Sequence, residues 1–343
     1  QLQSKNPKDL KKQLRVTFVG EEGVDEGGVQ KEFFQLVIRD IFDPKYGMFT
    51  YNEAAHHYWI NPTSAYLGSE GEFFLVGLVL GLAIYNSIIL DVRFPMVVYK
   101  KLTIPSGADS DINVDVTLDD LKEADPELAR GLEQLLKFEG DVSSTYHRTF
   151  QVEYDLFGEV QTVDLTPNGG VKQLTIENRE EYVDLYVQWV LNHSIATQFK
   201  ELKRGFDVIA VGGALQLFRH EELELLICGC QDLDFEALEA STEYDGGFTA
   251  QTPVIKYFWE IVHEFTDAQK KRLLFFATGS DRVPIGGLAN LHFVIAKNGA
   301  DSERLPTAHT CFNVLLLCDY SSKESLKAKI LTAIENAEGF GML

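Results

Sequence analysis

Residues 305–313 read Leu-Pro-Thr-Ala-His-Thr-Cys-Phe-Asn and run directly into the apolar segment Val314–Leu317. This order places a thiol, Cys311, at the junction between a polar loop and a predicted strand. An unperturbed thiol has a pKa of about 8.5, so a few per cent is thiolate near neutral pH, and sulfur is intrinsically nucleophilic. Most intracellular cysteines are simply small buried residues. The surrounding sequence must therefore decide whether Cys311 is reactive.

Composition excludes several classes of partner. The chain has 343 residues, 45% of them hydrophobic, which suits two domains of a globular protein. Its net charge is −21, from 31 basic and 52 acidic side chains, so nucleic acid and anionic lipid would be repelled. We therefore expect no nucleic-acid partner.

The cysteines indicate a reducing compartment. Cys228, Cys230, Cys311 and Cys318 are too few and too poorly spaced for a disulfide framework, and no secretory signal opens the chain. We expect a location in the cytosol, the nucleus or both. The chain begins at Gln1 rather than at Met, which predicts a piece of a longer protein.

One apolar stretch resembles a membrane span in length. Residues 73–90 carry no charge, but Glu72 and Asp91 flank them, and no Lys/Arg cluster supplies an orientation signal. The stretch predicts a helix buried on all sides, and no membrane is expected as a partner. Gly77 and Gly81 are then expected to allow close helix packing.

No pattern indicates a metal or a cofactor. His56 and His57 are adjacent and have no further ligands at metal-binding spacing. The pair Cys228 and Cys230 likewise lacks a second pair or a histidine. The acidic, glycine-rich residues 20–28 lack the Gly-Lys-Ser/Thr of a phosphate-binding loop.

The middle of the chain predicts apolar helix faces and a hairpin. Residues 150–163 alternate around Gly158, which predicts a β-hairpin, and residues 180–199 predict one long helix. Such faces ordinarily pack into a core. Further on, we expect a strand at 291–296, Asp267 capping one helix, and a capping box at Ser321 and Glu324 opening the last one.

The motifs along the chain together resemble one family. They are Gly-Val-Asp-Glu-Gly-Gly at 23–28, Tyr-Asp-Gly-Gly at 244–247, Thr-Gly-Ser-Asp-Arg at 278–282, the Cys311 loop and the ending Gly-Phe-Gly-Met-Leu at 339–343. In this order, the chain resembles the catalytic domain of HECT-type ubiquitin ligases. The ending is most similar to the branch typified by the human E6-associated protein.

The resemblance implies an α+β, bilobal fold. Residues 1–228 would form a mostly helical N-terminal lobe, with a projecting subdomain at about 105–200 that binds a ubiquitin-conjugating enzyme. Residues 229–231 (Gly229, Cys230, Gln231) would form a hinge. Residues 232–343 would form a smaller α/β catalytic lobe. The implied partners are ubiquitin, the conjugating enzyme and protein substrates, with no cofactor and no metal.

The resemblance also implies the residues of the site. Cys311 would carry ubiquitin as a thioester and pass it to substrate lysines, supported by His309, Thr310 and Phe340. The groove for the conjugating enzyme would consist of Leu128, Leu132, Leu135, Phe138, Tyr182 and Tyr186. Arg148 departs from the family, whose members tend to have an apolar residue there, so the groove rim and the preferred enzyme are expected to differ.

Two other functions compete with a transferase. A cysteine hydrolase acting on ubiquitin-like conjugates needs a histidine that a third group orients onto the sulfur. His309 is the histidine nearest in sequence, and no Asn or Asp partner for it is evident. A non-catalytic binding module of the ubiquitin pathway would form no covalent intermediate at Cys311.

Overall fold

The structure, a computed structural model, describes residues 7–17, 28–105, 112–210, 214–230, 233–283 and 286–336. The chain divides into two compact units. The first comprises Gln1–Lys12, Arg39–Tyr85 and Val92–Glu224, and the second comprises Gln13–Ile38, Asn86–Asp91 and Leu225–Leu343. Helices and strands occur in both units, as an α+β fold requires. The predicted boundaries at residues 228 and 232 stay a prediction.

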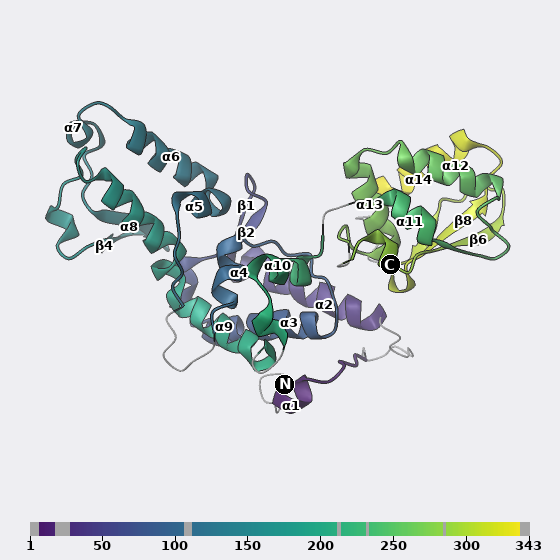
Figure 1. Ribbon diagram of the computed structural model, residues 1–343, viewed down its shortest axis with the longest axis horizontal. Helices are drawn as coiled ribbons and strands as arrows, with labels where there is room; N and C mark the ends of the chain where they lie inside the picture. Colours follow the sequence, from purple (N-terminus) through teal and green to yellow (C-terminus); the bar gives the residue numbers. More distant parts are fainter. Residues whose placement is uncertain are drawn as a thin grey trace. The chain divides into compact units, whose positions relative to one another are not determined.

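Two helices that cross at backbone contact organise the first unit. They are α3 (Glu70–Tyr85) and α9 (Ala196–Ala210), which lie side by side in Figure 1. A Cβ atom added to Gly77 would lie 1.8 Å from the carbonyl oxygen of Leu202, and one added to Gly205 would lie 1.9 Å from that of Phe74. Only glycine fits at these two positions. The prediction of close packing at Gly77 is confirmed, and the prediction of a buried helix is confirmed for residues 73–83, although α3 ends at the exposed Tyr85 and not at Leu90.

The first unit also contains a hairpin and several short helices. Its β1 (Phe49–Asn52) pairs with β2 (His57–Ile60), antiparallel, and the rings of Phe42, Phe49 and Phe94 pack together beside them. The remaining elements of this region are α1 (Pro7–Leu10), η2 (Pro44–Tyr46), η3 (Pro62–Leu67), α4 (Met96–Leu102) and η6 (Ala214–Leu217). Helix α2 (Gly28–Ile41) belongs to the second unit up to Ile38 and to the first from Arg39. Within the described residues, no helix has both the length and the apolar character that crossing a membrane requires.

A subdomain with its own core lies between α4 and α9, and is called the α5–α8 subdomain below. It contains α5 (Leu118–Ala124), α6 (Pro126–Lys137), α7 (Val142–Tyr146), β3 (Gln151–Leu156), β4 (Glu159–Asp164), η4 (Gly169–Val171) and α8 (Arg179–Leu191). The predicted hairpin is confirmed, because β3 and β4 pair antiparallel around a turn in which Phe157 and Gly158 both have positive φ. Thr117 forms a capping box with Asp120 at the start of α5.

The prediction of one helix over residues 180–199 is wrong. Helix α8 ends at Leu191, a 3₁₀ turn η5 (His193–Ile195) follows, and α9 starts at Ala196. The break occurs at Asn192, whose fully buried side chain accepts a hydrogen bond from Lys101 and donates one to the carbonyl of Val114. These distant partners, rather than local sequence, end the helix.

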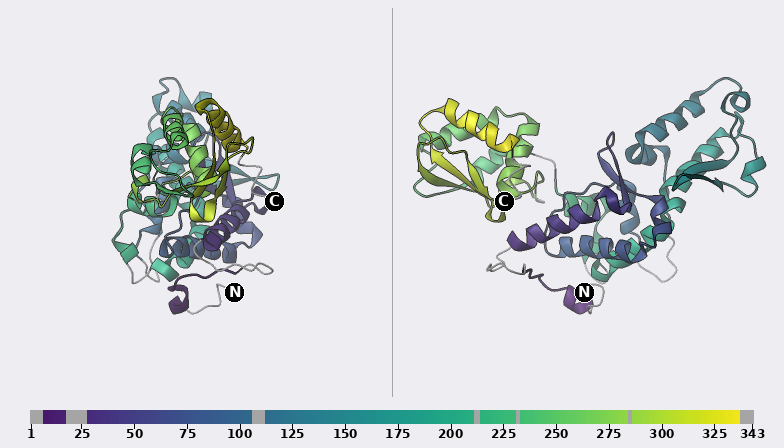
Figure 2. Two further views of the ribbon diagram at one scale, coloured as in Figure 1. Left: turned by 90° about the vertical axis from the view of Figure 1, so that its right-hand side faces the viewer. Right: turned by 180° about the vertical axis from the view of Figure 1, so that it is seen from behind.

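The second unit is a four-stranded sheet with helices packed on it. The strand order is β5 (Glu243–Asp245), β6 (Val294–Ala300), β8 (Val314–Asp319) and β7 (Thr307–His309), with β7 antiparallel to β8 and the other pairs parallel. Its helices are α11 (Phe235–Ser241), α12 (Pro253–His263), α13 (Asp267–Thr278), η7 (Leu288–Asn290), η8 (Thr310–Phe312) and α14 (Lys323–Glu335). Helix α10 (His220–Cys228) belongs to the first unit up to Glu224 and to the second from Leu225. Figure 2 shows the sheet beside α14. The strand predicted at 291–296 begins at Val294 and continues to Ala300.

Two predicted helix caps are each wrong by one residue. Thr266, not Asp267, is the N-cap of α13, and its side chain accepts a hydrogen bond from the backbone of Gln269. Ser322, not Ser321, is the N-cap of α14. Hydroxyl and carboxylate side chains are both good N-caps, so the side-chain type does not tell which of two adjacent residues is the cap. The path of the chain into the helix determines it.

Candidate functional site

Cys311 lies in a single 3₁₀ turn between two strands. The turn, η8, connects β7 to β8, and Asn313 closes it in the left-handed conformation with φ 52° and ψ 41°. The carbonyl of Asn313 accepts a hydrogen bond from the Val294 N–H at 3.1 Å, and its side chain donates one to the His292 carbonyl at 3.2 Å. The backbone of Cys311 is therefore fixed where β6 and β8 both begin, at the predicted junction of loop and strand.

The last turn of α13 borders the cysteine turn. A Cβ atom added to Gly279, which caps α13 with φ 72°, would lie 3.5 Å from the Cβ of Thr310. Phe312, next to Cys311, is 53% exposed. His309 is exposed, and among the described residues no side chain forms a hydrogen bond or ion pair with its ring. His309 and Thr310 directly precede Cys311 in the chain, and no group within the described ranges orients the imidazole.

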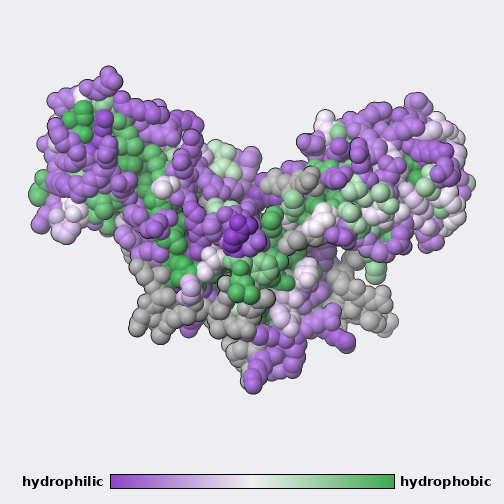
Figure 3. Space-filling view, in the orientation of Figure 1, coloured by the Kyte–Doolittle hydropathy of each residue, from purple (hydrophilic) through white to green (hydrophobic). Residues whose placement is uncertain are grey.

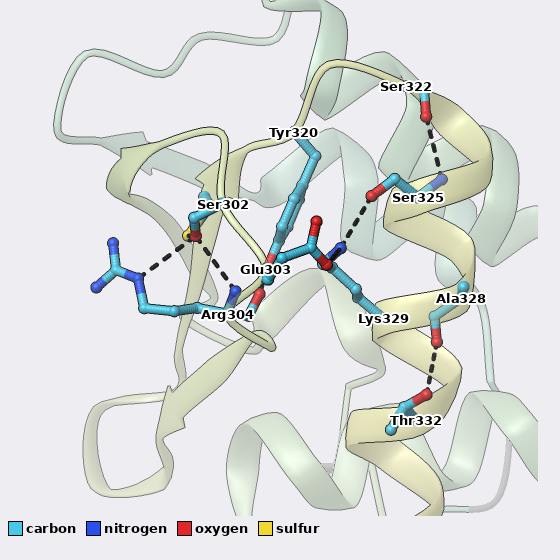
Figure 4. A network of polar contacts seen from close by, with 10 residues as sticks. Ser302, Glu303, Arg304, Tyr320, Ser322, Ser325, Ala328, Lys329 and Thr332 are labelled. Atoms are coloured by element: carbon cyan, nitrogen blue, oxygen red, sulfur yellow. Dashed lines mark hydrogen bonds and ion pairs between the residues drawn. The ribbon is translucent and has the colours of Figure 1, made fainter.

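A polar network holds the segment that enters β7 (Figure 4). The Tyr320 hydroxyl donates to the carbonyl of Arg304 at 2.6 Å, and Lys329 on α14 forms an ion pair with Glu303 at 3.0 Å. The side chain of Ser302 accepts hydrogen bonds from the backbone N–H and the Nε of Arg304. Burial raises the pKa of Tyr320, so its hydroxyl remains a donor. The cysteine turn therefore follows an anchored segment.

The six predicted groove residues lie together in the α5–α8 subdomain but differ in exposure. Leu132, Leu135 and Tyr182 are buried in its core, and Leu128, Phe138 and Tyr186 are partly exposed. The Tyr182 ring packs edge-on against Tyr186, with centroids 5.8 Å apart. Figure 3 shows apolar side chains gathered in a stripe on this subdomain among hydrophilic ones. The family resemblance named these six residues but could not separate the exposed members from the core.

Arg148 lies beside this cluster. Its Nη1 donates to the Glu153 carboxylate at 3.1 Å, and both side chains are about half exposed. Burial raises the pKa of Tyr182 to about 12, and the positive charge of Arg148 opposes that shift. Burial also raises the pKa of Tyr186, and the positive charge of Arg148 opposes this shift as well. Both tyrosines are therefore neutral hydrogen-bonding groups at physiological pH.

The predicted hinge is described only in part. Gly229 has φ 69° and follows directly after the end of α10. Cys230 exchanges two backbone hydrogen bonds with Val283, at 2.8 and 3.0 Å. Gln231 lies outside the described residues. Positive φ at Gly229 makes it the position where the chain turns away from α10.

Phe340 also lies outside the described residues, which end at Asn336. Helix α14 ends at Glu335, and the side chain of Asn336 donates to the carbonyl of Thr332 at 2.7 Å. Across the ranges that the structure describes, no cluster of three or more His, Cys, Asp or Glu side chains could hold a metal ion.

Comparison with known proteins identifies a family and several relatives. The HECT domain, described as a ubiquitin-transferase, matches residues 35–343. Over 339 residues the chain is 49% identical to the human probable E3 ubiquitin-protein ligase HECTD2, covering 97% of this chain and 43% of that protein. It is 41% identical to human probable E3 ubiquitin-protein ligase HERC4 (98% and 31%), and 39% identical to probable E3 ubiquitin-protein ligase HUL4 of Eremothecium gossypii (97% and 40%). The chain spans less than half the length of each of these relatives.

Proposed function

The chain belongs to the HECT-domain family of ubiquitin transferases, and from that premise we propose that Cys311 carries ubiquitin as a thioester between a conjugating enzyme and substrate lysines. In the first step, the Cys311 thiolate attacks the carbonyl carbon of the donor thioester, and the donor thiolate leaves. In the second step, a lysine amine attacks the new thioester, an amide forms, the amine loses a proton and the Cys311 thiolate leaves.

The fixed 3₁₀ turn is the observation that carries this proposal. Thioester exchange is nearly isoenergetic, so correct positioning of the sulfur supplies most of the rate. The strand pairing and Asn313 hold the backbone of the turn. A hydrolase would need an oriented imidazole to activate water, and none of the described side chains orients His309. The anchored backbone of the turn supports the transferase proposal.

The test is charging of Cys311 with ubiquitin in the presence of activating and conjugating enzymes. We expect a thiol-sensitive adduct with the wild-type chain, none with Cys311→Ala, and a thiol-resistant oxyester with Cys311→Ser. Cys318→Ala, which replaces a buried cysteine of β8, is the matched control and should still charge. An adduct that persists in Cys311→Ala would refute the assignment, and a chain that never charges would favour the binding module.

We further assign the conjugating-enzyme contact to the α5–α8 subdomain. The partly exposed members of the predicted groove, Leu128, Phe138 and Tyr186, support this assignment. Phe138→Ala should weaken binding of the conjugating enzyme by about 2 kcal/mol, because aromatic anchors dominate such interfaces. Leu132→Ala removes a buried side chain and should instead lower the free energy of unfolding by roughly 2–5 kcal/mol. Melting curves recorded beside binding isotherms separate the two effects.

The bilobal arrangement, with a hinge at residues 229–231, is also a proposal. Its support is that the apolar core of the second unit is built from residues 235–334. A fragment of residues 232–343 should therefore unfold cooperatively by itself in urea, whereas a requirement for residues 13–38 or 86–91 would contradict a boundary at 232. Membership of the E6-associated-protein branch rests on the Gly-Phe-Gly-Met-Leu ending, and the cytoplasmic or nuclear location rests on four cysteines that are too few and too poorly spaced for a disulfide framework.

A further inference from the structure

Helix α4 contacts the α5–α8 subdomain at both ends of the subdomain, where the chain enters it before α5 and leaves it after α8. In Figure 1, α4 lies between α5 and α9. We propose that α4 sets the orientation of this subdomain on the rest of the first unit, and that Lys101 is a positioning residue for the charging of Cys311. The effect on charging rests on the proposed transfer function, whereas the orientation does not.

Lys101 lies at the centre of this contact and is fully buried. Its ammonium donates to the side-chain oxygen of Asn192 and, at 3.1 Å, to the carbonyl of Ile112. Asn192 in turn accepts from the N–H of Val114 at 3.3 Å and donates to the carbonyl of the same residue at 3.0 Å. The ammonium also lies 5.5 Å from the centre of the Phe199 ring on α9. One side chain therefore joins the entering segment, the leaving segment and α9.

The rest of α4 holds the first helix of the subdomain. Lys100 forms an ion pair with Asp120 at 2.6 Å, and the two side chains are only 30% and 12% exposed, so solvent screens the pair little. Asp120 also completes the capping box of α5, so the pair is attached to a fixed helix end. The backbone N–H of Met96 donates to the carboxylate of Glu123 at 3.1 Å. Two consecutive lysines of α4 thus bind the start of α5 and the residue that ends α8.

The subdomain can change its orientation without losing its own core. Of the buried core residues that the structure describes there, all but Val97 of α4 lie between Leu121 and Leu191. A buried ammonium, by contrast, needs acceptors in fixed positions, because a misplaced acceptor leaves the charge without its hydrogen bonds. Loss of the ammonium should therefore release the orientation of the subdomain. The proposed groove, which belongs to this core, should stay intact.

Orientation matters for charging because of what the subdomain is proposed to carry. A conjugating enzyme bound there must bring its thioester to the sulfur of Cys311. A rotation at α4 displaces the bound thioester by an amount that grows with its distance from α4. Since a misplacement of about 1 Å can slow a reaction about 100-fold, a changed orientation should slow charging while leaving the affinity for the enzyme unchanged.

The first measurement is the orientation itself. Labels are placed at Val171 in η4 of the subdomain and at Tyr46 in η2, two exposed positions of the first unit, and their separation is measured by energy transfer. Lys101→Met keeps an unbranched side chain but removes the ammonium, and should shift or broaden the distribution of distances. Lys100→Met should act in the same direction to a smaller extent. Because Lys100 is partly exposed, this second variant decides the matter if Lys101→Met does not fold.

The second measurement is charging in a single turnover, with a saturating amount of ubiquitin-loaded conjugating enzyme. Lys101→Met should charge at least about tenfold more slowly than the wild type, with the affinity for the enzyme within about twofold. Lys203→Met is the matched control, because Lys203 is also buried but its ion pair with Asp207, at 2.5 Å, lies within α9. It should lower stability in urea without changing the label distances or the charging rate.

The outcomes separate this proposal from the proposed function. Unchanged label distances in both Lys101→Met and Lys100→Met would overturn the role of α4. Shifted distances with an unchanged charging rate would overturn the positioning role of Lys101. A slower rate in Lys203→Met equal to that in Lys101→Met would show that lost stability, and not orientation, is the cause. If the wild-type chain never charges, the transfer function is rejected, and the label distances alone decide whether α4 orients the subdomain.

Discussion

At the scale of single residues, one backbone conformation holds the cysteine turn. Asn313 adopts φ 52°, which is costly for most residues and least so for Gly and Asn. Asn313→Gly should therefore retain the fold and charging at Cys311. Asn313→Val should lower the free energy of unfolding by roughly 1–2 kcal/mol and slow charging. Urea titration and single-turnover charging measure the two effects, and a Val variant that matches the Gly variant in both would show that the turn does not depend on this conformation.

Tyr182 is predicted to make stability depend on pH in the alkaline range. Burial raises its pKa to about 12, whereas an unfolded tyrosine titrates near 10. Between these values the unfolded chain loses the proton and the folded chain keeps it, so stability falls as pH rises. The difference in free energy of unfolding between Tyr182→Phe and the wild type should therefore shift in favour of the variant by about 1 kcal/mol between pH 7 and pH 11. Alkaline denaturation curves of the two chains measure this gain, and an equal difference at both pH values would contradict the prediction.

At the scale of elements, the crossing of α3 and α9 allows no side chain at its contact points. Gly77→Ala would force a methyl group to within 1.8 Å of a backbone carbonyl, so the helices must separate. We expect a loss of at least about 3 kcal/mol in the free energy of unfolding. Gly131→Ala is the matched control in α6, where an added Cβ meets nothing within 4 Å. It should stabilise the chain by roughly 0.5–1 kcal/mol in the same urea titration, and equal effects of the two changes would contradict the packing.

The sequence predicted the elements that depend on residues close together in the chain. The apolar run of α3 and the β3–β4 hairpin follow from the pattern of apolar residues and from a turn glycine. The break at Asn192 could not be predicted, because its partners Lys101 and Val114 are far away in the sequence. Burial of Tyr182 was missed for the same reason, since Phe150 covers it across the subdomain. Cys311 was found through its flanking motif rather than through periodicity.

At the scale of the whole molecule, the proposed transfer requires the chain to perform two distinct reactions at one sulfur. Under that proposal, donor and acceptor approach Cys311 in separate steps, and positioning governs each of them. The described structure anchors the turn through β7, β8 and the network around Tyr320. Such anchoring is the same for both steps. We therefore expect a residue that acts in only one of the steps to belong to another segment, and the apolar ending of the chain is the candidate.

Removal of residues 340–343 is predicted to separate the two steps. Helix α14 is complete at Glu335 and is closed by Asn336, so the truncation should leave the melting temperature nearly unchanged. Charging of Cys311 should also persist, because the anchored turn is intact, whereas discharge to lysine should slow. The wild-type and truncated chains are charged in one pulse and chased with free lysine, and Phe340→Ala tests the aromatic ring alone. If the truncated chain fails to charge, or melts several degrees lower, Phe340 is a structural residue; if it charges and discharges normally, the ending has no part in transfer.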